Sequence, residues 1–321
     1  MAGKLVAVCG ATGQQGGAVV DALLRLGGYK VRALTRDPAS NSSKKLADKG
    51  VEVMKADFED PASLEAAFQG ADAVFGVTDF FAGCGLDPAR EIQQGKNMVD
   101  AAKKTGVGHF VWSTLEPAQE ATKGILEPVN AGYTVPHFDT KAEVEKYLHE
   151  QLPGKGTALL TSFFLENMLP GAWMAPMKQP DGTFIMVFPV GTATLAYCST
   201  ADIGNVAAAI IAGGPGKFAG KTVPVAGDYL TLAATTEAVS KLTGKKVVPV
   251  APPAEAWIEQ AKAGGVPELA AKDLANMCLF YQHVDMTALR SLDATKAVYP
   301  QVLNLDAWLE KHKQAFLDAT A

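Results

Sequence analysis

The 321-residue sequence predicts an α/β protein, a Rossmann-type doubly wound parallel sheet with a smaller α/β C-terminal domain. Two observations predict this fold class. Short apolar runs alternate with helical patterns through the first half, as in parallel strands joined by crossover helices. The glycine-rich stretch "GATGQQGG" follows the first apolar run and opens the first helical pattern. We therefore expect a dinucleotide-binding domain over 1–155 and a smaller substrate or partner domain over 156–321, with some strands returning to the first sheet.

The first half contains five strand and helix pairs in order. The expected strands are the apolar runs at 4–10, 30–36, 51–57, 71–78 and 108–114. The expected helices lie at 14–27, 43–49, 59–70, 88–105 and, after a polar connection at 116–136, at 138–150. The helix at 59–70 has the clearest end signals, because Asp60 is a good N-cap, Pro61 fits the first turn and Gly70 follows the end.

The second half is less regular. We expect strands at 157–162, 183–190, 221–227 and 245–250, and helices after Asp202 and over 233–243. Three prolines indicate a loop over 168–182, and apolar residues at helical spacing indicate a packed helix over 273–281. The tail reads as a helix capped by Asp306.

Composition excludes several classes of function. The net charge is −5 and the lysines and arginines are scattered, so direct nucleic-acid binding is not expected. The four cysteines form no CxxC pair and no short-spaced cluster with histidine, so we expect no metal site and no disulfide framework. No long uncharged apolar stretch indicates a membrane span, and we expect a cytoplasmic protein, with the nucleus as a second compartment.

The glycine-rich stretch predicts a dinucleotide site. Its turn needs unusual backbone dihedrals, the backbone must approach a pyrophosphate closely, and the following helix N-terminus offers free N–H donors. The expected contacts are Gly10, Ala11, Thr12, Gly13, Gln14, Gln15 and Gly16.

The end of the second strand predicts which dinucleotide binds. NAD sites usually place an acidic residue here for the ribose 2′-hydroxyl, whereas a 2′-phosphate needs a cation. The sequence has Thr35-Arg36, so we expect NADP(H), with Arg36 on the phosphate. Asp37 would weaken this preference if its carboxylate pointed toward the ribose.

Two further strand ends carry candidate cofactor contacts. Asp57 and Phe58 follow the third strand, near the expected adenine, and Thr78, Asp79 and Phe80 follow the fourth, near the ribose and pyrophosphate. Each is equally consistent with loop capping. Their shared place at carboxyl ends of parallel strands favours the cofactor interpretation.

The candidate reaction centre lacks a tyrosine. Ser113 and Lys141 stand where a short-chain dehydrogenase keeps its serine and lysine, but His137 stands where the acid tyrosine would be. Tyr133 lies eight residues before Lys141, in the expected loop. The three catalytic candidates are therefore Ser113, His137 and Lys141, and the favoured interpretation is that Lys141 holds the nicotinamide ribose while His137 lines the pocket.

Several motifs together resemble the NmrA-like family, atypical members of the short-chain dehydrogenase superfamily. They are "GATGQQGG", "TRDP", "HFDTKAEVEKYL", "FLENML", "DLANM" and "LDAWLEKHKQAF", in the same order over nearly the whole chain. Within the family the sequence most resembles the HSCARG-type NADPH sensors. The resemblance implies an NADP(H) site that also includes Lys141 and the segment Phe164, Leu165, Glu166 and Asn167.

The resemblance implies a redox-sensing regulator with little or no dehydrogenase activity, which acts through a protein partner. The alternative is an NADPH-dependent reductase of quinones or other conjugated carbonyls, similar to the isoflavone-reductase relatives, because some reductions take their proton from water. The sequence names neither partner nor substrate, and leaves a homodimer open. Asp79 and Gln93 depart from the sensors, which carry asparagine and lysine there.

Overall fold

The computed structural model describes residues 3–321. The elements of the first half are β1 (Lys4–Val8), α1 (Gln14–Leu26), β2 (Tyr29–Thr35), α2 (Asn41–Asp48), β3 (Glu52–Lys55), α3 (Pro61–Phe68), β4 (Ala73–Gly76), α4 (Pro88–Thr105), β5 (His109–Thr114), α5 (Ala118–Ala121), α6 (Pro136–Gln151) and β6 (Gly156–Leu160). Those of the second half are β7 (Phe163–Phe164), η1 (Leu165–Met168), β8 (Met177–Lys178), β9 (Phe184–Val187), β10 (Leu195–Cys198), α7 (Thr200–Gly213), α8 (Pro215–Phe218), β11 (Thr222–Pro224), β12 (Asp228–Leu230), α9 (Leu232–Thr243), β13 (Val247–Val250), α10 (Ala254–Ala263), α11 (Glu268–His283), α12 (Met286–Leu289), α13 (Leu292–Val298) and α14 (Leu305–Ala319).

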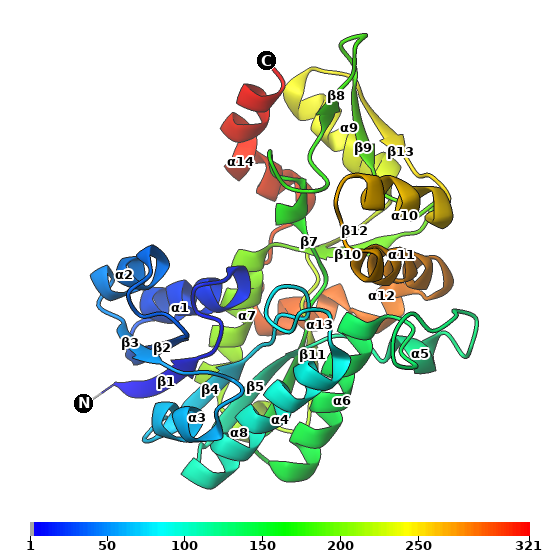
Figure 1. Ribbon diagram of the computed structural model, residues 1–321. Coiled ribbons are helices and arrows are strands. Elements are labelled where there is room, and N and C mark those ends of the chain that lie inside the picture. Colours follow the sequence, from blue (N-terminus) through cyan, green and yellow to red (C-terminus); the bar gives the residue numbers. More distant parts are fainter. Residues whose placement is uncertain (1–2) are drawn as a thin grey trace.

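A seven-stranded parallel sheet confirms the predicted fold class. Its order is β11-β6-β5-β4-β1-β2-β3, so the strand order reverses between β1 and β4. Helices α1 and α7 pack on one face, and α3, α4 and α6 pack on the other (Figure 1). Ligands of such sheets bind beyond the carboxyl ends of the strands at this reversal, which directs attention to the loops after β1 and β4.

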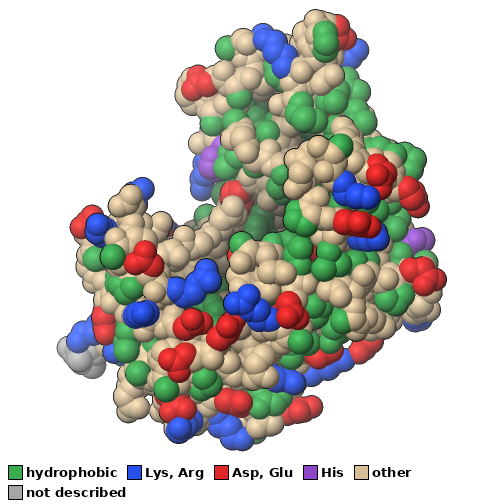
Figure 2. Space-filling model, in the orientation of Figure 1, with side chains coloured by type: hydrophobic (Ala, Val, Ile, Leu, Met, Phe, Trp, Pro, Cys, Tyr) green, Lys and Arg blue, Asp and Glu red, His purple; other side chains and the backbone are tan. Residues whose placement is uncertain are grey.

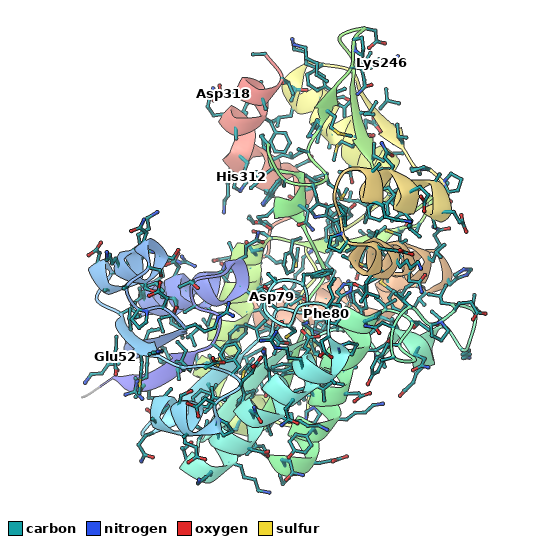
Figure 3. The ribbon with its side chains drawn as sticks, in the orientation of Figure 1. Glu52, Asp79, Phe80, Lys246, His312 and Asp318 are labelled. Atoms are coloured by element: carbon teal, nitrogen blue, oxygen red, sulfur yellow. The ribbon has the colours of Figure 1, made fainter. Side chains whose placement is uncertain are left out.

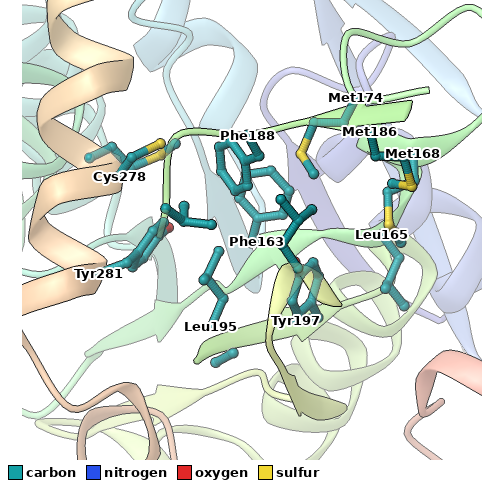
Figure 4. Close-up of a cluster of buried hydrophobic side chains, with 14 of the residues drawn as sticks. Phe163, Leu165, Met168, Met174, Met186, Phe188, Leu195, Tyr197, Cys278 and Tyr281 are labelled. Atoms are coloured by element: carbon teal, nitrogen blue, oxygen red, sulfur yellow. The ribbon is translucent and has the colours of Figure 1, made fainter. Parts of the chain in front are cut away.

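The cap region consists of two small sheets, β12-β10-β7 and β13-β9-β8, with helices α9, α10, α11 and α14 (Figure 1). Its core is rich in aromatic and sulfur-containing side chains, with Phe163 near Phe188 and Tyr197 (Figure 4). Strands β6 and β11 both follow residue 155, yet both belong to the large sheet rather than to the cap region.

Buried polar contacts attach the cap region to the large sheet. Arg290, fully buried before α13, donates from Nε to Glu116 Oε1 at 2.6 Å, and Glu116 follows β5. Glu166 in η1 accepts hydrogen bonds from Ser199 at the start of α7 and from Trp308 in α14. These contacts fix the position of the cap region beside the carboxyl ends of the strands.

Two helix ends differ from the sequence-based expectation. Asn304, rather than Asp306, caps α14, because its Oδ1 accepts the backbone N–H of Ala307. Helix α6 begins at Pro136, two residues earlier than expected, which places His137 in its first turn. No helix within residues 3–321 is long and apolar enough to cross a bilayer.

Candidate functional site

A cavity of about 830 Å³ lies between the carboxyl ends of the large sheet's strands and the cap region. The hollow between the two parts is visible on the molecular surface in Figure 2. Its walls combine the loops after β1, β2, β3 and β4 with the ends of β5 and β6 and the N-terminal turn of α6, and with β7 and α11. It therefore lies where the topology predicts a dinucleotide site.

The loop after β1 has the backbone that a pyrophosphate site needs. Gly10 has a φ of +61°, and the backbone N–H of Gly13 donates to Gly10 O at 2.9 Å. A Cβ on Gly16 would lie 2.3 Å from Gly10 O, so the close approach of α1 to the loop requires glycine. The free N–H groups of the first turn of α1 belong to residues that line the cavity.

Arg36 follows β2, is exposed, and lines the cavity. The neighbouring Asp37 also reaches this wall, but its Oδ1 accepts the backbone N–H of Ala39 at 2.9 Å, so its carboxylate is held within its own turn. Arg90, a second arginine on the wall, contacts Glu59. The charge arrangement at this end of the cavity therefore favours a phosphate beside Arg36.

The aspartates after β3 and β4 both accept hydrogen bonds from backbone N–H groups of their own loops. Asp57 Oδ1 accepts the backbone N–H of Glu59, and Asp79 Oδ1 accepts those of Phe81 and Ala82 at 3.1 Å. Asp79 and Phe80 lie on the loop that faces the cap region (Figure 3). Because its charge is directed toward backbone N–H groups, Asp79 presents less negative potential to a phosphate than its place in the sequence suggests.

Lys141 is held by a buried carboxylate. Its Nζ donates to Glu91 Oε1 at 2.5 Å, and Glu91 is completely buried. Glu91 also accepts from the hydroxyls of Thr78 and Thr140. The lysine charge is therefore compensated, and its ammonium has a fixed position on the cavity wall with further N–H groups available to a ligand.

His137 meets a second buried carboxylate. Its Nδ1 contacts Oδ2 of Asp273 in α11, and its backbone N–H donates to Asp273 Oδ1 at 3.3 Å. The rings of Phe81 and Phe138 lie 5.2 and 4.7 Å from the imidazole. The charged group in contact with this ring is therefore the carboxylate of Asp273, and not the ammonium of Lys141.

The hydroxyl groups of Ser113 and Tyr133 both donate hydrogen bonds to other side chains. Ser113 Oγ, at the end of β5, donates to Gln15 Oε1 at 2.6 Å and so connects the substrate end of the cavity to the glycine loop. Tyr133 donates to Glu143 Oε1 at 2.6 Å, and burial together with this carboxylate raises its pKa. Tyr133 is therefore not a replacement for the missing acid.

The cavity gathers most of the residues predicted from sequence. Those on its walls are Gly10, Thr12, Gly13, Gln14, Gln15, Gly16, Arg36, Asp57, Phe58, Thr78, Asp79, Phe80, Ser113, His137, Lys141, Phe164 and Asn167. Ala11 and Leu165 are buried in the core, and Glu166 is engaged with Ser199 and Trp308, so these three lie off the wall.

The cap region contributes wall residues that the sequence did not indicate. They are Phe163, Trp173, Leu274, Met277 and Tyr281, and they form a largely apolar chamber. Tyr281 and Cys278 project from the same helix, α11, toward the aromatic core (Figure 4). Burial raises the pKa of Tyr281. For the three residues on α11 the only sequence signal was the helical spacing at 273–281, which indicates packing and not a site.

Comparison with known proteins finds a matching family and a relative that carries the same family name. The NmrA-like family matches residues 2–309. An NmrA-like family domain-containing protein of Dictyostelium discoideum is 31% identical over 253 residues, which cover 76% of this chain and 79% of that protein.

Two solved structures share the fold. The negative transcriptional regulator NmrA, in complex with NADP, superposes with a TM-score of 0.82 at 19% identity, covering 100% of this chain and 98% of that one. The NADPH-dependent quinone oxidoreductase of Escherichia coli, complexed with NADPH, gives 0.74 at 24% identity over 95% and 99%.

Proposed function

This chain belongs to the NmrA-like family, and from the geometry of its cavity we propose that it binds NADP(H) and reduces a conjugated carbonyl or a quinone. NADPH, when bound, supplies the hydride for such a reaction. The proposal has two parts, the cofactor and the acceptor, and different observations support each.

The residues present fit the cofactor. A Cβ at position 16 would collide with the backbone of Gly10, so glycine here lets α1 begin directly against the loop and aim its first N–H groups at the cavity. Arg36 lines the wall beyond β2, the carboxylate of Asp37 beside it accepts a hydrogen bond within its own loop, and that of Glu59 is paired with Arg90. This combination of donors suits the pyrophosphate and the 2′-phosphate of NADP(H).

The observation that favours a reductase is the apolar chamber beyond the expected cofactor contacts. Besides Ser113 and Lys141, the walls of the cavity include Phe163, Trp173 and Met277 of the chamber. Flat apolar walls of this kind suit a planar, conjugated acceptor. The structural resemblance to the quinone oxidoreductase of Escherichia coli supports the same class of acceptor.

A second candidate, the NADP(H)-sensing regulator, is favoured by the missing acid tyrosine. Tyr133 is hydrogen-bonded to Glu143, and Lys141 is hydrogen-bonded to Glu91 and not to a tyrosine. A protein that only reports cofactor occupancy needs no proton donor, and the resemblance to the regulator NmrA supports this candidate. Such a regulator requires a conformation that differs between the NADPH and NADP⁺ forms.

Steady-state oxidation of NADPH by the full chain, stripped of nucleotide beforehand, tests the proposal. The acceptors are benzoquinones, naphthoquinones and α,β-unsaturated ketones, and a Gly16→Ala variant serves as the control for site-specific turnover. We expect saturable NADPH oxidation with at least one of these acceptors and its loss in the variant. Tight NADPH binding by calorimetry without any oxidation would favour the regulator instead.

A further inference from the structure

We propose that His137, held by Asp273, is the proton donor that replaces the missing tyrosine, an inference that rests on the reductase function proposed above. The chain assembles this pair from distant positions, because His137 lies in the first turn of α6 and Asp273 lies 136 residues later in α11. Asp273 is a positioning residue in this proposal, and His137 is the group that meets the acceptor.

The contacts show that Asp273 is dedicated to His137. Its Oδ1 accepts the backbone N–H of His137 at 3.3 Å, and its Oδ2 contacts Nδ1 of the ring. Oδ2 and Nδ1 lie in contact, and among residues 3–321 neither of these two buried atoms forms a regular hydrogen bond with any group. Since a buried polar atom without a partner is costly, each of these two atoms depends on the other.

This arrangement fixes the ring's orientation. A carboxylate can only accept, so the contact places the hydrogen of the neutral ring on Nδ1. Nδ1 is buried against Asp273, and His137 lines the cavity, so Nε2 is the nitrogen left for a ligand. The rings of Phe80, Phe81 and Phe138 surround the imidazole and restrict its rotation.

The surrounding charges favour proton donation. The ammonium of Lys141, one helical turn further along α6, is compensated by the buried Glu91, so it does not oppose a second positive charge on the imidazole. The carboxylate of Asp273 stabilises the imidazolium. The other ionisable groups on this part of the wall are Asp79, which is bonded to its own loop, and Tyr281.

Reduction adds one hydride and one proton to the acceptor. The acceptor receives a hydride, and the His137 Nε2–H bond breaks as its proton passes to the acceptor oxygen. The acceptor gains two electrons and two hydrogens in total, and NADPH is oxidised to NADP⁺. Water then returns a proton to Nε2.

The first test needs no turnover. We would record ¹⁵N-detected ring spectra of the NADP⁺-loaded full chain against pH, using His137→Gln to assign the signal. In the wild type we expect the neutral ring to carry its hydrogen on Nδ1, and in Asp273→Asn we expect the neutral ring to lose this preference. A wild-type ring whose neutral form carries its hydrogen on Nε2 would overturn the proposal.

The second test is kinetic. We expect His137→Gln to lower kcat by about 100-fold or more and Asp273→Asn by about 10-fold, with NADPH affinity within about twofold of the wild type. The matched control is His283→Gln, because His283 is an exposed histidine on the same helix as Asp273 and lies away from the cavity wall.

A Tyr281→Phe variant distinguishes His137 from the phenol hydroxyl on the same cavity wall. Burial raises the pKa of Tyr281, so it is a weak acid, and we expect Tyr281→Phe to lower kcat far less than His137→Gln does. Turnover that survives in His137→Gln but not in Tyr281→Phe would overturn the His137 proposal and leave the reductase intact. A wild type that reduces no acceptor would contradict the reductase, and with it this step.

Discussion

Arg36 offers a direct test of cofactor preference, through the substitution Arg36→Ala. The guanidinium lies on the cavity wall after β2, and the carboxylate of Asp37 beside it is held by the backbone N–H of Ala39. A charge-assisted hydrogen bond contributes about 1.5–3 kcal/mol. Because Arg36 is exposed, solvent screening places its contribution at the lower end. We therefore expect about a tenfold loss of NADPH affinity, which is about 1.4 kcal/mol.

The assay is a set of calorimetric titrations with NADPH and NADH on wild type and Arg36→Ala. NADH lacks the 2′-phosphate, so its affinity should change by less than about twofold, and the NADPH difference should shrink at high salt. Lys45→Ala is the control, because Lys45 is an exposed cation in α2 and lies off the cavity wall. An equal loss for NADPH and NADH would refute the assignment of Arg36 to the 2′-phosphate.

Three further substitutions test other parts of the structure. Gly16→Ala would place a Cβ 2.3 Å from Gly10 O, so NADPH affinity measured by calorimetry should fall by more than about tenfold; wild-type affinity would contradict the loop's assigned role. Glu91→Gln leaves the Lys141 ammonium buried without a counter-charge, so urea unfolding should show a loss of about 3–5 kcal/mol, and a loss below about 1 kcal/mol would count against it. Burial lowers the pKa of His109 to about 4, so its stabilising effect is complete above the unfolded pKa near 6.5 and is lost as the pH falls toward 4. Between pH 6.5 and pH 5, the free energy of unfolding should fall by about 2 kcal/mol more in the wild type than in His109→Gln. An equal fall in the two proteins would contradict this.

Local signals made much of the Rossmann half predictable. Strands β1, β3, β4 and β5 lie within the expected runs, and β2 begins one residue earlier than expected, at Tyr29. The signal is clearest for β4, which is buried along its whole length and therefore needs continuous apolar sequence. Asp60 caps α3 and accepts the backbone N–H of Ala62, as its spacing predicts. The glycine loop was predictable from local sequence too, because the backbone geometry of one short turn requires glycine at Gly10 and Gly16.

The rest of the site depends on contacts between distant positions. Asp273 meets His137 across 136 residues, and Glu91 meets Lys141 across 50, so no periodic pattern connects either pair. Asp273 reads in sequence as one polar residue within an amphipathic helix. The sequence therefore indicated only that His137 lines the pocket, and the carboxylate that contacts its ring comes from α11.

Transfer of hydrogen from the cofactor to an acceptor is the central claim, and isotope transfer tests it most directly. The full chain would be mixed with NADPH deuterated at the nicotinamide C4, on the transferable face, and with the best acceptor of the panel, and the product analysed by mass spectrometry and NMR. For an unsaturated ketone, we predict one deuterium per product molecule, fixed on carbon, and its loss in Gly16→Ala. A protein that binds NADPH through this cavity but returns no deuterium to any acceptor would contradict the reductase account.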